Sequence, residues 1–295
     1  MSPKFITGEP ALLIGKTLVI ADLHIGIESE YMKSGITVPS QIEQMTGKID
    51  RLIQQTSAKK IVFLGDIKNQ VPGVSFQELR ELPEFFSHFS CLETHIVLGN
   101  HDSEIPALVE NVKIHGTSAL SFSEKKVVSR RHETSRHHEM PILRSQRKGF
   151  NNGIKIHGTD GFRLGSAYIT HGHAWPKKEF LSCKYIIVSH THPLIEIKDR
   201  IGYKFFEKVW VKASFNLEKL SKKYKKKISK APEIILMPAF NELSGGAALN
   251  VETGRRQRLT SETFLGPITQ LVDKKQTDIF LLDGTYLGKL DSLRK

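Results

Sequence analysis

The sequence predicts an α/β fold in which buried strands alternate with helices. Two observations predict it: short runs rich in isoleucine and valine recur along the chain, and segments whose apolar residues have helical spacing lie between them. Hydrophobic residues make up 39% and charged residues 25% of the 295 residues, which is typical of a globular protein rather than of a disordered or membrane chain. We therefore expect one large domain over residues 1–295.

Strands are predicted where an apolar run lacks polar alternation, which indicates burial on both faces of a sheet. Each of the first five runs ends at a cluster of polar residues. These runs are 17–21, 60–64, 94–98, 166–170 and 185–189, and two further strands are predicted at 234–237 and 279–282. Helices are predicted at 40–56, where Met45, Ile49 and Leu52 have helical spacing, and at 76–89.

The formal net charge of +12 comes from two segments of the chain. Residues 124–148 carry eight lysines and arginines against three glutamates, and residues 219–230 carry seven lysines and no acidic residue. The first segment lies within an aperiodic stretch, 121–165, that we interpret as a basic insertion. Such segments suit a polyanion such as nucleic acid, although lysine-rich surface runs also serve simply to keep a protein soluble.

The first apolar stretch, residues 11–21, does not have the properties of a membrane segment. Lys16 interrupts it and Asp22 follows it at once, so it is too short and too polar to cross a bilayer or to act as a signal peptide. We therefore expect a cytoplasmic protein without a membrane partner.

Metal-binding residue types follow each of the first five predicted strands. Because loops at the carboxyl ends of strands in an open α/β sheet converge, side chains there can meet at a common centre. Carboxylates, imidazoles and one amide, without sulfur, suit divalent ions such as manganese, iron or zinc. The clusters, in chain order, are Asp22-Leu23-His24, Gly65-Asp66, Gly99-Asn100-His101-Asp102, His171-Gly172-His173 and His190-Thr191-His192.

The spacing within the clusters indicates a site for two ions. Asp22 and His24 are two residues apart, so on extended backbone they point the same way and can hold one ion. Asp66 has two carboxylate oxygens and is the natural bridge between two ions about 3.5–4 Å apart. His190 and His192 repeat the two-residue spacing, so that one of them can serve each ion.

This series of clusters resembles the five motifs of the calcineurin-like metallophosphoesterase superfamily over residues 22–192. Within the superfamily, the chain is similar to a branch of archaeal and bacterial phosphoesterases that are sometimes encoded beside DNA ligase and helicase genes. Segments 236–241 and 281–284 share that similarity. The resemblance implies two packed mixed β-sheets flanked by helices, in a four-layer α/β/β/α sandwich. It also implies nucleic acid or nucleotides as substrate, and DNA-repair proteins such as a helicase or ligase as partners.

The resemblance implies a role for each matching residue. His101 matches the family's catalytic histidine, which stabilises the transition state and protonates the leaving oxygen, and Asp102 would orient its imidazole. Asp66 would bridge two divalent ions, for which we expect manganese, with iron, zinc or nickel as alternatives. The other metal ligands would be Asp22, His24 and His192 for the first ion and Asn100, His171 and His190 for the second.

The implied reaction is hydrolysis of a phosphate ester by a hydroxide that bridges the two ions. Our leading hypothesis is a phosphodiesterase or nuclease. The alternatives are a phosphomonoesterase or protein phosphatase on the same core, and a non-catalytic scaffold. Protein phosphatases normally have GDxxDRG and GNHE, whereas this chain has Gly65-Asp66-Ile67-Lys68-Asn69 and ends its third cluster with Asp102. Scaffolds of this fold typically lose metal ligands, and this chain retains them.

Three other residues have roles that the sequence leaves open. Lys68 would either touch a substrate phosphate or lie in the loop as a solvated lysine. His173 is expected near the site, as a second candidate for substrate binding. Trp175 would either wall the pocket and stack on a base or pack in the core. The sequence also leaves open whether cleavage is internal or terminal, and the oligomeric state.

Overall fold

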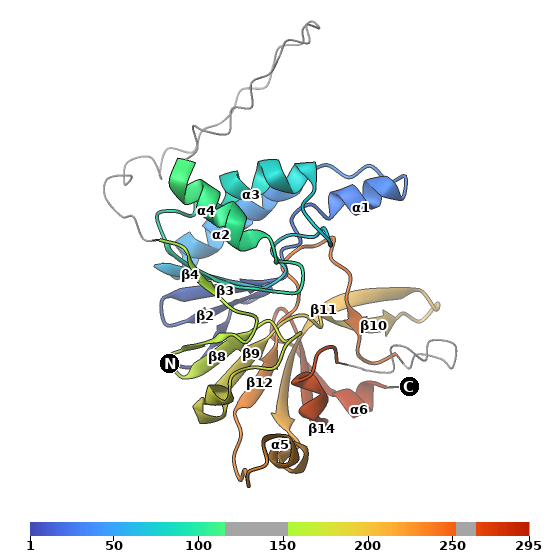
Figure 1. Cartoon of the computed structure of the whole chain (residues 1–295). Coiled ribbons are helices and arrows are strands. Elements are labelled where there is room, and N and C mark those ends of the chain that lie inside the picture. The colour runs from blue at the N-terminus through green and yellow to red at the C-terminus, as the bar shows by residue number, and fades with distance from the viewer. Residues whose placement is uncertain (116–152, 252–263, 295) are drawn as a thin grey trace, which may run out of the picture.

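A computed structural model describes residues 1–115, 153–251 and 264–294 of the chain. Two β-sheets pack face to face, and helices cover their outer sides (Figure 1). Most of the predicted basic insertion, up to residue 152, lies outside the described residues. Among the described helices, none is both long enough and apolar enough to span a bilayer.

The first sheet has six strands in the order β1-β2-β3-β4-β5-β6. The pairs from β1 to β3 are antiparallel and those from β3 to β6 are parallel, so the carboxyl ends of β3, β4 and β5 meet at one edge. The strands are β1 (Lys4–Phe5), β2 (Ala11–Ile14), β3 (Thr17–Ala21), β4 (Lys60–Leu64), β5 (Glu93–Val97) and β6 (Lys155–His157).

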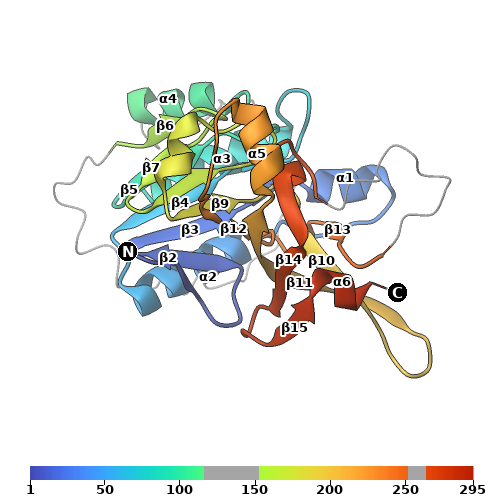
Figure 2. The same ribbon diagram turned by 90° about the horizontal axis from the view of Figure 1, so that it is seen from below.

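The second sheet has nine strands, of which seven follow the order β13-β10-β11-β12-β9-β8-β7, while β14 pairs with β11 and with β15. Strands β8, β9 and β12 are parallel, so the carboxyl ends of β8 and β9 also lie together. Both views show the β10–β11 hairpin projecting from the sandwich (Figures 1 and 2). The strands are β7 (Phe162–Leu164), β8 (Ala167–Thr170), β9 (Tyr185–Val188), β10 (Pro193–Lys198), β11 (Lys204–Phe215), β12 (Glu233–Leu236), β13 (Ala247–Ala248), β14 (Val272–Leu281) and β15 (Tyr286–Lys289).

The helices divide between the two outer faces. Side chains of α2, α3 and α4 share a core with the first sheet, and those of α5 and α6 share a core with the second. The helices are α1 (Glu28–Lys33), α2 (Ile42–Thr56), α3 (Phe76–His88), α4 (Ile105–His115), α5 (Leu217–Tyr224) and α6 (Leu290–Leu293). Two short 3-10 turns, Lys178–Ser182 and Thr269–Leu271, complete the second outer layer.

Alternate residues of the central strands belong to different cores. In β3, Leu18 and Ile20 pack in the core shared with the helices, whereas Val19 packs between the sheets together with Ile187 of β9. Successive strand side chains point to opposite faces, so a strand covered on both sides must be apolar at every position. This requirement explains the unbroken apolar runs in the sequence.

The structure confirms the predicted α/β class and the two packed sheets flanked by helices. Strand β14 begins at Val272, seven residues before the strand predicted at 279. The prediction missed this part of the strand because residues 273–276 are polar and at least partly exposed. Residues 153–165, the described end of the predicted insertion, contribute β6 to the first sheet and β7 to the second. They are therefore part of the sandwich.

Replacing Phe63 with alanine should destabilise the protein by about 3–5 kcal/mol. Its ring is fully buried between the sheet and α3, with ring centroids 5.2 Å from Phe85 and 6.4 Å from Phe86. Urea unfolding measures the loss. Phe76→Ala is the matched control, because that ring is 94% exposed and its removal should change the free energy of unfolding by less than about 0.5 kcal/mol. Equal losses in the two variants would contradict the assigned core.

Candidate metal centre

The candidate ligands lie on five loops that follow strands of both sheets. Three loops follow β3, β4 and β5 of the first sheet, and two follow β8 and β9 of the second (Figure 1). Backbone hydrogen bonds join the first two loops: Asp22 N–H donates to Gly65 O at 3.1 Å, and His24 N–H donates to Asp66 O at 2.8 Å. The loops are therefore held together before any cation is considered.

Five of the candidate ligands have left-handed backbone. Their φ angles are 54° at Asp22, 42° at His24, 46° at Asp66, 66° at His190 and 43° at His192. For a residue with a Cβ this conformation costs of the order of 1–3 kcal/mol, and it persists only where the surrounding structure enforces it. Such strain collects at functional sites, so the backbone indicates the same residues as the motifs do.

The first ligand group consists of Asp22, His24, Asp66 and His192, whose ligand atoms all lie within 4.8 Å of one another. His192 Nε2 is 3.4 Å from Asp22 Oδ1, and His24 Nε2 is 3.8 Å from Asp66 Oδ2. The two sheets contribute jointly, because Asp22 and His24 follow β3 whereas His192 follows β9.

The second ligand group consists of Asp66, His171 and His190. His171 Nε2 is 3.5 Å from Asp66 Oδ2 and 3.1 Å from Asp22 Oδ1, and its ring centroid is 4.8 Å from that of His190. Asp66 belongs to both groups. The structure thus brings together six of the seven predicted ligands around one shared carboxylate.

The first group has an unpaired carboxylate oxygen that fits a cation. Asp22 Oδ2 is buried and has no hydrogen-bond partner within the described part of the chain. His192 Nδ1 lies 2.9 Å from Gly245 O, and because a carbonyl oxygen only accepts, Nδ1 carries the proton. In the neutral ring, Nε2 therefore presents a lone pair, 3.4 Å from His24 Nε2. Imidazole nitrogens and carboxylate oxygens without sulfur suit manganese, iron or zinc.

The ionisation states of three candidate ligands also fit cation binding. Burial lowers the pKa of His24 and of His190 to about 4, and the neighbouring imidazoles of His192 and His171 lower them further. Burial alone would raise the pKa of Asp22, but His192 and His171 outweigh it and hold the pKa below its usual value. Near neutral pH, His24 and His190 are therefore neutral and Asp22 is ionised, which are the forms that bind metals. Burial alone would lower the pKa of His171 and His192 as well, but the charges of Asp66 and Asp22 outweigh it and raise both pKa values, so a cation would have to displace a proton from these two rings.

Two glycines allow the loops to approach this closely. A Cβ at Gly99 would collide with the carboxylate of Asp66, and a Cβ at Gly65 would collide with the ring of His171. Asn100, the seventh predicted ligand, follows Gly99 and is exposed. The next residue, His101, donates its backbone N–H to Asp66 Oδ1 at 3.0 Å, so the Asn100 backbone lies beside the shared carboxylate.

A family model described as calcineurin-like phosphoesterase matches residues 15–221, which include every predicted metal ligand. The chain belongs to the calcineurin-like phosphoesterase family. The family predicted from the motifs is thus confirmed. Among solved structures, the chain is similar to the crystal structure of the nuclease MPE from Pseudomonas putida, with 16% sequence identity and a TM-score of 0.48 over 97% of this chain and 99% of that chain. No curated protein matches the chain.

In this calcineurin-like phosphoesterase, His101 presents its Nε2 to the metal centre. Its Nδ1 donates to Asn69 O at 2.6 Å, and Nε2 lies 3.8 Å from Asp66 Oδ2. The ring is 26% exposed, so one side of it is open to solvent. Sequence reasoning missed Asn69, because its contribution comes from a backbone carbonyl, which leaves no side-chain pattern.

The predicted contact between Asp102 and the His101 imidazole is wrong. Asp102 is fully buried, and its Oδ1 accepts from the N–H groups of Ile67 at 2.8 Å and Lys68 at 3.3 Å, while Oδ2 accepts from Gly99 N–H at 2.8 Å. Burial and the nearby charge of Asp66 raise its pKa to about 6. Asp102 therefore joins the loops after β4 and β5 instead of orienting the imidazole.

The predicted contact between Lys68 and a substrate phosphate is also wrong. Its side chain is 1% exposed, so it is not a solvated lysine either. Nζ donates to the carbonyl oxygens of Gln70 and Gly73 and pairs with Glu104 Oε2 at 2.9 Å. These three partners saturate the ammonium group, which closes the loop after β4 and faces no open site.

His173 lies beside the site, as expected, and contacts a ligand. Its Nδ1 is 2.8 Å from Nδ1 of His171, which holds the His171 ring with Nε2 toward Asp22 and Asp66. Burial, together with the charge of His171, lowers the pKa of His173 to about 4. A contact between His173 and substrate stays a prediction.

Replacing Asp66 with asparagine should weaken the binding of both cations. The loss of affinity should exceed the roughly 10- to 100-fold that is typical of changes outside the ligand shell. The carboxylate is shared by both ligand groups, and an amide offers a single neutral oxygen. Equilibrium dialysis against Mn²⁺ measures bound cations per chain. Asp50→Asn is the control, because Asp50 pairs with His88 on the helical layer. Full occupancy of one cation in Asp66→Asn would contradict a shared ligand.

Proposed function

We propose that this protein is a manganese-dependent phosphodiesterase that cleaves nucleic acid. The observation that carries the proposal is the shared position of Asp66 between two groups of imidazoles and carboxylates. Two cations so close together suit a phosphate group, whose oxygens they can bind jointly. The family supports hydrolysis of a phosphate ester, and the choice of a diester rests on the surface charge described below.

The cations would be held by the residues that the motifs predict. The first would bind Asp22, His24 and His192, and the second would bind Asn100, His171 and His190, with Asp66 shared. When bound, two such cations neutralise phosphate charge and make a water-derived nucleophile available near neutral pH. The cations also need ligands that are already in place before binding. The left-handed loops would meet this need, because they hold the ligand side chains in position without a change of backbone conformation.

His101 would serve the leaving group. The Asn69 carbonyl fixes the ring through Nδ1, so Nε2 is the nitrogen available to a substrate. In the protonated form, Nε2–H stabilises negative charge on a phosphoryl oxygen and then gives its proton to the leaving oxygen. The open side of the ring gives a phosphate ester room to approach.

The lysine-rich segment 219–230 supports a polyanionic substrate. Its seven lysines are all exposed. Lys223 Nζ lies 3.7 Å from the ring centroid of Trp175, which is 37% exposed and follows His171 by four residues. This contact links α5 to the loop that carries a metal ligand. Lysines that track a backbone beside an exposed aromatic ring are typical of proteins that bind single-stranded nucleic acid.

Manganese-loaded protein should hydrolyse phosphodiesters, and His101→Ala should slow this about 10²- to 10⁴-fold with its manganese content unchanged. The panel is bis-p-nitrophenyl phosphate, p-nitrophenyl phosphate, a cyclic nucleotide, and single- and double-stranded DNA. His88→Ala is the control, because His88 lies on α3 and pairs with Asp50. Hydrolysis of the monoester alone would contradict a phosphodiesterase. A cation-loaded protein inert toward the whole panel would be a scaffold.

Replacing Lys219, Lys222 and Lys223 with glutamine should weaken binding of single-stranded DNA and lower the slope of log K against log salt by about two. The matched control replaces three exposed lysines elsewhere, Lys4, Lys16 and Lys59, of which the last two precede β3 and β4 at the edge opposite the metal centre. Fluorescence anisotropy at several salt concentrations measures both quantities. Equal effects of the two triple variants would remove the assigned surface.

A further inference from the structure

Residues 237–246 cross from the second sheet to the first next to the candidate metal centre. After β12, Met237 N–H donates to Val188 O of β9 at 2.8 Å, and Phe240 N–H donates to Ala21 O of β3 at 2.9 Å. This segment lies outside the residues that the family model matches, 15–221. Its position next to the ends of β3 and β9 places it against the ligands that follow both strands.

Asn241 holds the turn that carries Asp22 and His24. Its side chain is buried, and Nδ2 donates to Leu23 O at 2.7 Å and to His24 O at 3.4 Å. The left-handed turn directs these carbonyls away from a regular ladder, and the amide donates to both of them, although His24 O also accepts from Ile27 N–H at 3.1 Å. Asn241 Oδ1 accepts from Leu243 N–H at 2.9 Å, so the side chain uses both its donor and its acceptor group.

The same loop holds His192. The carbonyl of Gly245 accepts from His192 Nδ1 at 2.9 Å, and Ser244 Oγ lies 3.1 Å from the same nitrogen. These partners keep the proton on Nδ1 and turn Nε2 toward Asp22. Metal-binding histidines generally need such a partner, since it fixes both the tautomer and the ring orientation.

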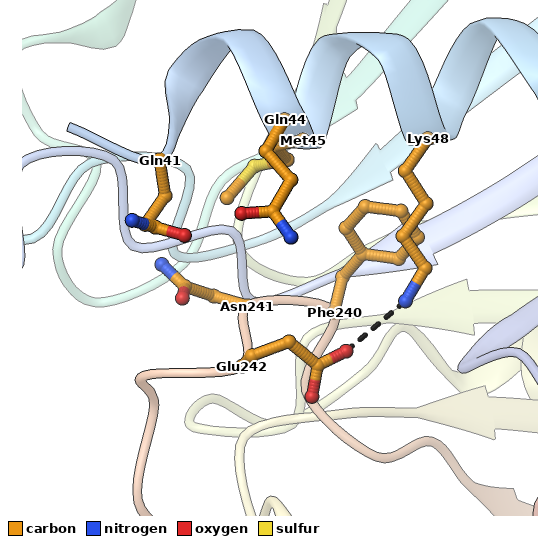
Figure 3. A pocket seen from close by; sticks show the side chains of 7 residues that line it. All are labelled: Gln41, Gln44, Met45, Lys48, Phe240, Asn241 and Glu242. Carbon is orange, nitrogen blue, oxygen red and sulfur yellow. Dashed lines mark hydrogen bonds and ion pairs between the residues drawn. The ribbon is translucent and has the colours of Figure 1, made fainter. Parts of the chain in front are cut away.

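The loop is itself braced against both layers of the sandwich. Glu242 pairs with Lys48 of α2 at 3.0 Å (Figure 3) and with Lys208 of β11 at 3.0 Å. Lys208 Nζ also donates to Asn241 O at 2.9 Å, and Tyr31 OH donates to Leu243 O at 2.9 Å. Figure 3 shows Asn241 and Glu242 lining a pocket together with residues of α2 such as Gln44. The loop is therefore a fixed frame for the ligands.

We propose that loop 241–246 is the positioning element for the first cation only. Asn241 fixes the Asp22–His24 turn, while the Gly245 carbonyl and the Ser244 hydroxyl fix His192. Among the described residues, the hydrogen bonds of this loop reach neither His171 nor His190, so the second cation does not depend on it directly. The inference rests on the proposed function only in that these residues bind two cations.

Replacing Asn241 with leucine tests the proposal, because leucine has a similar size and lacks both the donor and the acceptor. The first cation should bind roughly 10- to 100-fold more weakly, as is typical of changes to residues that orient ligands. The second cation should bind as in the unchanged protein. Mn²⁺ titration followed by electron paramagnetic resonance distinguishes the two, because the spectrum of a coupled ion pair gives way to that of a single ion.

Asn250→Leu is the matched control. Asn250 also clamps backbone with both functions, since Nδ2 donates to Glu196 O and Oδ1 accepts from Glu196 N–H, each at 2.9 Å. The control should therefore have a similar cost in the free energy of unfolding and leave the paired-ion spectrum intact. Loss of the first cation in both variants would mean a general loosening and would overturn the proposal.

Ser244→Ala is the second variant, since it removes one contact to His192 and keeps the fold intact even if Asn241→Leu does not fold. It should lower the affinity for the first cation about tenfold, at the lower end of such effects. Unchanged affinity for the first cation in the folded variants would overturn the inference while leaving the proposed function standing. Failure of the unchanged protein to bind two Mn²⁺ ions would instead remove the proposed function itself.

Discussion

The close approach of the loops after β4, β5 and β8 is the constraint on which the candidate metal centre depends. Asp66 can serve two ligand groups only if His171 and the Gly99 backbone come within contact distance of it. No side chain larger than hydrogen fits at Gly65 or Gly99. Asp102 also holds the loops after β4 and β5 together, since its one buried carboxylate accepts hydrogen bonds from N–H groups of both loops. Packing of backbone, more than any single ligand, sets the geometry.

The strained turns have a corresponding source of stability. Ligand turns in left-handed conformation oppose folding, and the two flanking cores, together with the core between the sheets, must supply the compensation. The strands that carry the ligands are almost entirely buried, so the strained turns begin at well-packed parts of the framework. The loop 241–246 adds hydrogen bonds to two carbonyl groups of the turn after β3.

Much of the fold and the proximity of most candidate ligands could be predicted from the sequence, because both depend on residue type and spacing. Unbroken apolar runs identified β3 and β4, and the polar clusters after the strands identified Asp22 and Asp66. The first half of β14 escaped prediction because its polar residues lie at the surface of a sheet edge.

The errors concern contacts that tertiary structure decides. Asp102 follows His101 directly, yet successive side chains diverge, and the carboxylate reaches a neighbouring loop instead. Lys68 is a charged residue that the sequence places in a loop, and its burial depends on carbonyl groups that only the folded loop gathers. The role of Asn241 was equally hidden, because its partners are backbone atoms more than two hundred residues away.

The first ligand group draws on both halves of the sandwich, and this has a consequence for folding. A cation held by Asp22, His24 and His192 would bind the native chain and not the unfolded one, in which these residues are far apart in sequence. By mass action, a free cation concentration of 100 times the dissociation constant adds about 2.7 kcal/mol to native stability. The cation would then stabilise the packing of the two sheets against each other. A shortage of metal would therefore lower the stability of the native protein as well as limit its chemistry.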